Sequence, residues 1–476
     1  MHNRLIVVSN RVPLPSADGV SLGGLVSALL PSLEAMGSTM WFGWSGQTAS
    51  APASVLWSTP HRVSARGVEY VTVDLTEREV HGYYEEYGNR VLWPLLHGLV
   101  QHMAPEAAAS YEVYRAVNQR FARALRPLLR PDDLVWVHDY HLIPLGAELR
   151  QLGWHGRTGY FQHTPIPSVE AWSQLPQGVV LADLFSAYDL IGVQTDRDRV
   201  NLGDILISED TAARVAAYPI SIDAEHFREF TKASAGSAVP VEWPDAEMVY
   251  FGVERLDYTK GIPQRLEAFE RALISAPEMQ EGARFVQWAA PSRTGVPEYQ
   301  AEREAIEAAA ERLNARFDDP PLEIDFEAYP AEAVAPALEQ ADVCVVSSVA
   351  DGMNLVAKEF AAVHSADHPG VLVMSDMCGA AEELTDALIY PADDVDAMSA
   401  AMREAYFMPL AERRRRAASL REVVDRHTSR DWLHEFVSDL REVLPRTRVA
   451  ATYVGPHHGT PDRRGVTPAP RTARAR

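Results

Sequence analysis

The sequence has little cysteine and no excess of positive charge, and each shortage excludes a class of protein. Only two cysteines, Cys344 and Cys378, occur in 476 residues, and they form no CxxC pair. This argues against a zinc site or a disulfide framework and favours a reducing compartment. The formal net charge of −22 argues against nucleic-acid or anionic-membrane binding, because a phosphate backbone requires clustered lysine and arginine.

Long apolar runs are also absent. The chain shows no membrane span, and its first residues, 1–4, lead into a short apolar run without signal-peptide features. We therefore expect a cytoplasmic protein that binds neither membranes nor nucleic acids. The sequence has no HExxH motif and no histidine and aspartate spacing suited to a metal, so we expect no metal cofactor. Homo-oligomerisation stays open.

The sequence does contain short apolar runs that alternate with helical patterns. This alternation predicts mostly parallel sheets covered by helices on both faces. In the first half, strands are expected at 5–9, 71–73, 134–137, 159–161 and 190–193, and helices at 25–36, 111–129 and 142–152. In the second half, strands are expected at 249–252, 285–288, 322–324, 343–346 and 371–374, and helices at 262–273, 298–317, 331–340, 355–363 and 394–406.

The length of 476 residues predicts two domains of about 200 residues each. A segment rich in Ser, Ala, Gly and Pro, 230–245, is typical of a linker. We therefore expect α/β architecture with two doubly wound Rossmann-like domains, 1–230 and 231–428, and a ligand site in the cleft between them. The Arg-, Pro-, Gly- and Thr-rich segment 447–476 predicts a disordered basic tail.

One strand-to-helix turn stands out as a ligand site. The segment from Ala350 to Glu359 follows the expected strand 343–346 and runs into an expected helix, at the sheet edge where open α/β folds bind ligands. Gly352 allows close approach of a ligand, and free N–H groups at the helix start suit a phosphate or a sugar hydroxyl. Glu359 lies at the reach expected for a ribose diol. An ordinary turn with a surface glutamate would give the same pattern.

Cations follow two neighbouring expected strands. Arg255 and Lys260 lie five residues apart across a turn, where both could bind one diphosphate, and Arg293 follows the next strand. Solvated loop charges are the alternative. In the first half, His138, Asp139 and His163 stand where apolar strands end, although a lone histidine is more often structural. Aromatic residues near expected loops suit sugar stacking, although most aromatic residues belong to cores: Trp41, Trp44, Tyr83, Tyr84 and Trp93.

These motifs occur together with Ser9-Asn10-Arg11, Gly23-Gly24, Trp41 to Gly46, Leu92-Trp93-Pro94, Glu254 to Gly261 and Gly379 to Leu384. In this order they resemble the trehalose-6-phosphate synthase family, glycosyltransferase family 20, whose members are retaining enzymes with the GT-B fold. The resemblance covers about residues 4–445, with the basic tail outside it. It implies that a helix at 429–446 packs back on the first domain.

The resemblance implies transfer of glucose from UDP- or GDP-glucose to glucose 6-phosphate, giving α,α-trehalose 6-phosphate without a cofactor. On the donor side it assigns the diphosphate to Arg255 and Lys260, the base to Tyr329, and a closing loop to Gly23 and Gly24. It assigns the donor glucose to Asp351, Gly352, Met353 and Asn354. The nucleotide is assigned to Leu355, Val356, Ala357, Lys358 and Glu359, with Glu359 on the ribose. On the acceptor side it assigns the phosphate to Arg11, Tyr84 and Arg293 and the sugar to Trp93 and Asp139, and Trp41 is a further expected acceptor residue. It places His163 near the reacting carbon, and the expected catalytic group is His163, Asp139, Arg255, Lys260 and Asp351.

Two positions depart from the family pattern. Ala350 stands where an arginine is usual, which leaves the donor base open, and Thr164 stands where an isoleucine is usual, which could relax acceptor selectivity. Three alternatives remain: another GT-B transferase such as a glycogen-synthase-like enzyme, a pseudo-glycosyltransferase, and a non-catalytic sugar-nucleotide sensor. A sensor would be expected to lose the acceptor residues while keeping Arg255 and Lys260, and here both sets are present.

Overall fold

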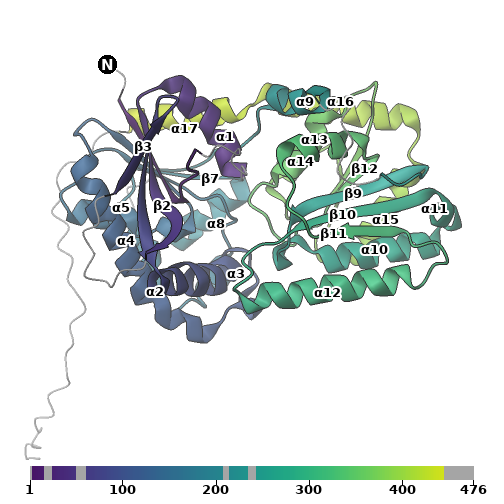
Figure 1. Ribbon diagram of the computed structural model, residues 1–476, viewed down its shortest axis with the longest axis horizontal. Coiled ribbons are helices and arrows are strands. Elements are labelled where there is room, and N and C mark those ends of the chain that lie inside the picture. Colours follow the sequence, from purple (N-terminus) through teal and green to yellow (C-terminus); the bar gives the residue numbers. More distant parts are fainter. Residues whose placement is uncertain (1–2, 16–23, 50–59, 207–213, 234–242, 444–476) are drawn as a thin grey trace, which may run out of the picture. The chain divides into compact units, whose positions relative to one another are not determined.

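Two sheets form the framework of the chain (Figure 1). The computed structural model describes residues 3–15, 24–49, 60–206, 214–233 and 243–443. The eight-stranded sheet has the order β3-β4-β2-β1-β5-β6-β7-β8, and all its neighbours run parallel except β3 and β4. Its strands are β1 (Leu5–Arg11), β2 (Thr39–Ala49), β3 (His61–Ala65), β4 (Val68–Thr76), β5 (Leu134–His138), β6 (Thr158–Phe161), β7 (Leu190–Val193) and β8 (Arg214–Ala217).

The six-stranded sheet is parallel throughout, with the order β11-β10-β9-β12-β13-β14. Numbered within the sheet, this is the order 3-2-1-4-5-6 of doubly wound nucleotide-binding folds. Its strands are β9 (Met248–Arg255), β10 (Ala283–Ala290), β11 (Leu322–Asp325), β12 (Val343–Val346), β13 (Val371–Ser375) and β14 (Leu388–Tyr390).

Helices cover both faces of each sheet because the buried strands are apolar on both sides. In β1, Leu5 and Val7 pack into one core cluster, whereas Ile6 and Val8 pack into another. The helices that accompany the first sheet are α1 (Gly24–Met36), α2 (Glu77–Glu79), α3 (Trp93–Leu96), α4 (Tyr111–Leu125), α5 (Leu145–Gln151), α6 (Val169–Trp172), α7 (Gly178–Phe185) and α8 (Asp196–Leu206), with a π-helical segment η2 (Val80–Leu92). The remaining helices are α9 (Ala224–Ala233), α10 (Ile262–Ser275), α11 (Pro277–Gly282), α12 (Pro297–Asn314), α13 (Ala331–Gln340), α14 (Leu355–Val363), α15 (Val395–Phe407), α16 (Leu410–Arg426) and α17 (Ser429–Glu442).

The last helix, α17, packs on the first sheet although it follows the second in sequence. The ring centroids of Trp432 and Phe436 lie 5.0 and 4.6 Å from that of Trp136 on β5. A Cβ at Gly159 or Gly192 would come within 2.8 Å of the Phe436 ring, so both positions accept only glycine without repacking. Small residues on β6 and β7 therefore make room for this helix.

The α/β class with two doubly wound sheets is confirmed, and most expected elements lie within two residues of the observed ones. The expected linker is wrong at its start, because residues 230–233 belong to α9, where Phe230 packs against the core. Residues 234–242 and the expected tail, 447–476, lie outside the described residues, and the domain boundaries remain a prediction. β2 was missed because its many aromatic residues were assigned to loops.

Candidate active site

The expected site residues gather at the points where the strand order of each sheet reverses. In the second sheet, β9 and β12 are neighbours, so Arg255 at the end of β9 lies beside the turn 347–354 that follows β12. In the first sheet, β1 and β5 are neighbours, which brings Arg11 and His138 to one edge. Ligands of doubly wound folds bind at this place, beyond the carboxyl ends of the strands.

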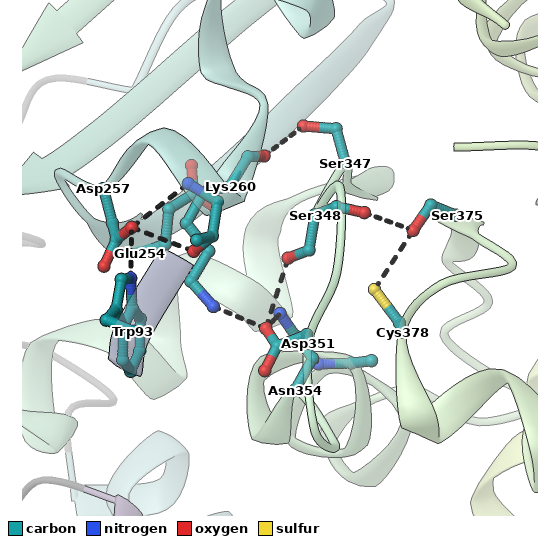
Figure 2. A network of polar contacts seen from close by, with 12 residues as sticks. Trp93, Glu254, Asp257, Lys260, Ser347, Ser348, Asp351, Asn354, Ser375 and Cys378 are labelled. Carbon is teal, nitrogen blue, oxygen red and sulfur yellow. Dashed lines mark hydrogen bonds and ion pairs between the residues drawn. The ribbon is translucent and has the colours of Figure 1, made fainter. Parts of the chain in front are cut away.

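Lys260 and Asp351 form the centre of the donor half of the site (Figure 2). The Lys260 Nζ lies 2.5 Å from Oδ2 of Asp351, which also accepts from Ser348 Oγ at 3.2 Å and Asn354 Nδ2 at 3.1 Å. Burial alone would raise the pKa of Asp351, but the Lys260 ammonium holds it below its ordinary value. The carboxylate is therefore ionised and orients the ammonium that the resemblance assigns to the diphosphate.

The turn after β12 has an unusual backbone that brings it against the first domain. Asn354 has a φ of +70°, and its side chain caps α14 by accepting from the N–H of Ala357 at 3.2 Å. A Cβ at Gly352 would lie 1.9 Å from the carbonyl oxygen of His163, so only glycine fits this approach. The turn thus places the start of α14 beside the first-domain segment that carries His163.

Arg255 differs from Lys260 because its side chain is exposed. Among the described residues no carboxylate forms an ion pair with it, although its charge helps to lower the pKa of Asp257, and its guanidinium carbon lies 5.6 Å from the centroid of the Trp93 ring. An exposed arginine beside a buried ion pair leaves one full positive charge for an anionic ligand.

A cavity of about 620 Å³ brings three of the expected donor residues together: Gly24, Tyr329 and Glu359. The Tyr329 ring lies 4.1 Å from the Trp288 ring, and its hydroxyl donates to Asp325 at 2.6 Å. Burial raises the pKa of Glu359 to about 7. The volume lies within the range of small-molecule sites. The wall of the cavity also includes charged or titratable residues of α1, α9, α13, the β3–β4 turn and the segment before α9: Glu34, Arg66, Asp223, Glu225, His226, Glu229 and Glu332.

The other donor residues take different places. Gly23 lies outside the described residues, whereas a Cβ at Gly24 would lie 2.9 Å from Cδ1 of Leu355. The side chains of Met353 and Ala357 are buried in the core, and those of Leu355 and Val356 are half-buried against it. These positions can reach a ligand chiefly through their backbone.

The side chain of Lys358 binds the protein itself. Its side chain is 1% exposed, and its Nζ donates to Glu383 at 2.6 Å and to the carbonyl of Ile220 at 2.8 Å. This buried ion pair occupies the ammonium, so Lys358 could serve the expected nucleotide site only through its backbone, and that assignment stays a prediction. Lys358 instead joins α14 to the chain segment that leads from the first sheet to the second.

In the first-domain half of the site, burial shifts the pKa values of His163 and Asp139 toward their uncharged forms. The His163 Nε2 lies 2.9 Å from Nδ1 of His138, and burial lowers the pKa of His163 to about 3. Asp139 has a φ of +72°, accepts from the N–H of His163 at 3.2 Å, and has its pKa raised to about 6 by burial. Thr164 is 7% exposed, and its hydroxyl accepts from Gln162 at 2.5 Å.

Aromatic rings connect the expected acceptor residues. The Arg11 guanidinium carbon lies 6.0 Å from the Trp44 ring, Trp44 lies 5.9 Å from Tyr84, and Tyr84 stacks on His141 at 5.6 Å. Trp41 is a correction to the expected acceptor set, because it is 0% exposed and its Nε1 donates to Ser9 Oγ within the core. The sugar-stacking hypothesis fails for Trp41 for this reason. It fails equally for Tyr83, which is also 0% exposed.

Arg293 and Trp93 meet across the two halves of the chain. The Arg293 guanidinium carbon lies 3.8 Å from the Trp93 ring, and its Nη1 donates to Asp257 Oδ2 at 3.1 Å. Arg293 Nε is buried and has no hydrogen-bond partner in the described part of the chain. With a φ of +48°, Arg293 is held in a strained backbone, as are Asp139 and Asn354. Strain of this kind concentrates at ligand sites.

Sequence reasoning missed the buried residues that hold the loop carrying Arg255 and Lys260 in place through hydrogen bonds. Arg265 is 0% exposed, binds Glu254 through two nitrogen atoms at 2.6 and 3.0 Å, and donates to Ser347 Oγ at 2.9 Å. Ser347 in turn donates to the carbonyl of Lys260 at 2.8 Å. Asp257 was quoted within the Arg255–Lys260 motif but received no role. A carboxylate between two cations in a short loop was the available signal.

Two features are absent from the described residues: a cluster of side chains that could hold a metal ion and a helix that could cross a membrane. No group of three or more His, Cys, Asp or Glu side chains in that part of the chain could hold a metal ion. No described helix is long and apolar enough to cross a membrane. Cys344 and Cys378 are both buried as free thiols.

Fold and site together define a GT-B glycosyltransferase, with two doubly wound sheets, Arg255 and the Lys260–Asp351 pair at one switch point, and His163 and Asp139 at the other. The chain belongs to glycosyltransferase family 20, whose model matches residues 4–442.

Similar proteins support this assignment over nearly the full length. The trehalose-6-phosphate synthase of Cronobacter sakazakii is 37% identical over 467 residues, which cover 94% of this chain and 96% of that protein. A UDP-forming α,α-trehalose-phosphate synthase structure from Burkholderia vietnamiensis matches with a TM-score of 0.88 at 36% identity, covering 93% and 98% of the two chains. A UDP-forming synthase from Burkholderia xenovorans in complex with glucose-6-phosphate matches with a TM-score of 0.86 at 33% identity, covering 92% and 100%.

Proposed function

We propose that this protein transfers glucose from a nucleoside diphosphate glucose to glucose 6-phosphate, with retention at the anomeric carbon, to give α,α-trehalose 6-phosphate. The observation that carries the proposal is the exposed Arg255 beside the buried Lys260–Asp351 pair at the switch point of the second sheet. The related synthases from Cronobacter and Burkholderia carry this activity in their names.

The cations suit the leaving group of this reaction. Breaking a sugar–nucleotide bond leaves negative charge on the diphosphate, and Arg255, Lys260 and the N-terminus of α14 can stabilise it. The first-domain half offers His163 and Asp139 near the expected sugar position, as groups that orient hydroxyls. Because no carboxylate is assigned as a nucleophile, we propose attack on the face that the leaving group departs from, with a diphosphate oxygen accepting the acceptor's proton.

The acceptor phosphate is assigned to Arg11, Tyr84 and Arg293. The ring contacts from Arg11 through Trp44 to Tyr84 support this grouping, since they bring the first two residues into one region. Trp93 and Asp139 would orient the acceptor sugar. Because the two substrates are cytoplasmic metabolites, the proposal also places the enzyme in the cytoplasm.

For the donor base, we propose that both uracil and guanine are accepted. The two Burkholderia structures above are named UDP-forming, and the cavity of about 620 Å³ leaves room for a purine. Carboxylates in its wall, such as Glu332 and Asp223, could accept from the N–H groups of guanine. Ala350 is 3% exposed and does not belong to the cavity wall, so its small size bears on the base less directly than the sequence suggested.

The test is a donor screen with glucose 6-phosphate, in which kcat/KM is measured for UDP-, GDP- and ADP-glucose and the product is identified. Formation of trehalose 6-phosphate with UDP- or GDP-glucose supports the function. Product formation with neither donor contradicts it. A hundredfold preference for UDP-glucose over GDP-glucose would contradict only the dual base proposal.

The acceptor assignment has its own test. Arg11 is exposed, so Arg11→Ala should leave the fold intact and raise the KM for glucose 6-phosphate by about 10- to 100-fold, since a hydrogen bond to a charged group contributes about 1.5–3 kcal/mol. The KM for the donor should change much less. Arg62→Ala, at another exposed arginine of the first sheet, is the matched control. Equal effects on both substrates would contradict the assignment.

A further inference from the structure

The side chain of Asp257 contacts three parts of the site at once. It belongs to the loop between Arg255 and Lys260 and is 0% exposed. Its Oδ1 accepts from the N–H and the hydroxyl of Thr259, at 3.1 and 2.9 Å, within its own loop. A buried carboxylate of this kind is tolerated only when it is fully hydrogen-bonded.

The same carboxylate also reaches the residues assigned to the acceptor. Trp93 Nε1, from α3 beside the first sheet, donates to Oδ1 at 3.3 Å, as Figure 2 shows. Arg293 Nη1 and the Tyr299 hydroxyl each donate to Oδ2 at 3.1 Å. Asp257 therefore fixes the Arg293 guanidinium that stacks 3.8 Å from the Trp93 ring.

We propose that Asp257 is a positioning residue that couples the two substrate sites, so that donor binding to the Arg255–Lys260 loop orders Trp93 and Arg293 for glucose 6-phosphate. This inference rests on the proposed function for the identity of the two ligands. Its basis is geometric, because one rigid carboxylate joins the donor loop to two acceptor residues, one of them in the other half of the chain. Ordering the loop with a nucleotide thus fixes the acceptor groups.

Coupling of this kind is a ratio of affinities. The dissociation constant of glucose 6-phosphate is measured by calorimetry on the full chain, with and without saturating UDP, or GDP if the donor screen selects it. In the unmodified protein we expect the nucleotide to tighten acceptor binding at least about fivefold, at the lower end of typical coupling factors. In Asp257→Asn the ratio should fall to about one, while the affinity for the nucleotide alone changes little.

Two further variants separate coupling from general damage. Thr259→Val removes a hydrogen bond from the same carboxylate but only within its own loop, so the ratio should stay as in the unmodified protein. Trp93→Phe keeps an aromatic ring but removes the Nε1 donor, so it should lower the ratio even if Asp257→Asn fails to fold. An unchanged ratio in Trp93→Phe and Asp257→Asn, or an equal loss in Thr259→Val, would overturn the inference.

The outcomes also separate this inference from the proposed function. If no donor gives trehalose 6-phosphate, the function is wrong. If the enzyme is active but the unmodified protein shows no enhancement by the nucleotide, only the coupling by Asp257 is wrong.

Discussion

The switch points of the two sheets differ in how their surroundings shift the pKa values of the polar side chains. At the second sheet, Lys260–Asp351 and Arg293–Asp257 are ion pairs, and Arg255 stands exposed beside them. Opposite charges there hold the pKa values of Asp351 and Asp257 below the ordinary range, although burial acts against this.

At the first sheet, burial instead favours the uncharged forms. It lowers the pKa of His163 to about 3 and of His141 to about 3, and it raises the pKa of Asp139 to about 6. The difference fits a reaction in which new negative charge develops on the leaving diphosphate, whereas the sugar groups near His163 and Asp139 are hydroxyls. Fixed charges are most useful where charge develops, whereas neutral groups suffice to orient hydroxyls.

Some charged residues of the second half stabilise the fold, whereas others are expected to bind a ligand. Lys358→Ala removes a buried ammonium and leaves Glu383 without its partner; breaking a buried pair costs about 3–5 kcal/mol of unfolding free energy, and the lower end of that range applies here because the Glu383 side chain is 22% exposed. We expect a large loss of stability by thermal or chemical unfolding, with an unchanged donor KM in the folded fraction. A raised donor KM at normal stability would restore Lys358 to the donor site.

Arg255→Ala is the opposite case, because the side chain is exposed and has no ion-pair partner in the described residues. We expect kcat to fall because about 2–4 kcal/mol of transition-state stabilisation is lost, while the unfolding midpoint stays constant. Lys260→Ala should lose both activity and stability, since it leaves Asp351 unpaired. Arg303→Ala, on the surface of α12, is the control. Near-native turnover in Arg255→Ala would refute the diphosphate assignment.

Sequence reasoning predicted the elements well and the side-chain environments less well. Alternating apolar runs are a local signal, so β7, β12, α13 and α14 were predicted to within a residue. Whether a polar side chain at such an element binds a ligand or the protein depends on distant segments. Lys358 shows this, because its partners Ile220 and Glu383 lie 138 and 25 residues away.

Predictions for the aromatic residues were less reliable for the same reason. Trp41 was predicted to contact a sugar, but its strand is central in the sheet, which local sequence cannot reveal. The assignment of Trp93 and Tyr84 to the acceptor remains a prediction. The resemblance supplied residue roles, while the coupling role of Asp257 required the three-dimensional contacts.

The protonation state of the cavity carboxylate Glu359 can be tested through the pH dependence of stability. Burial raises its pKa from 4.5 to about 7, so the folded protein retains a proton that the unfolded chain has released. Stability therefore falls as pH rises from about 4.5 to about 7, by at most about 3 kcal/mol at about 1.36 kcal/mol per pKa unit. Glu359→Gln cannot ionise, so its stability advantage over the unmodified protein should be larger at pH 8 than at pH 5. A pH-independent difference would contradict the raised pKa.

The smallest expected effect is that of a chelator, and it tests whether protein cations alone serve the leaving group. A divalent ion on a diphosphate usually needs one or two carboxylates beside it. The two acidic residues next to the expected diphosphate position, Asp257 and Asp351, are already paired with Arg293 and Lys260. We therefore expect EDTA to leave kcat/KM unchanged for the preferred donor. Loss of activity in EDTA, restored by magnesium, would show that a metal supplies positive charge that Arg255 and Lys260 do not.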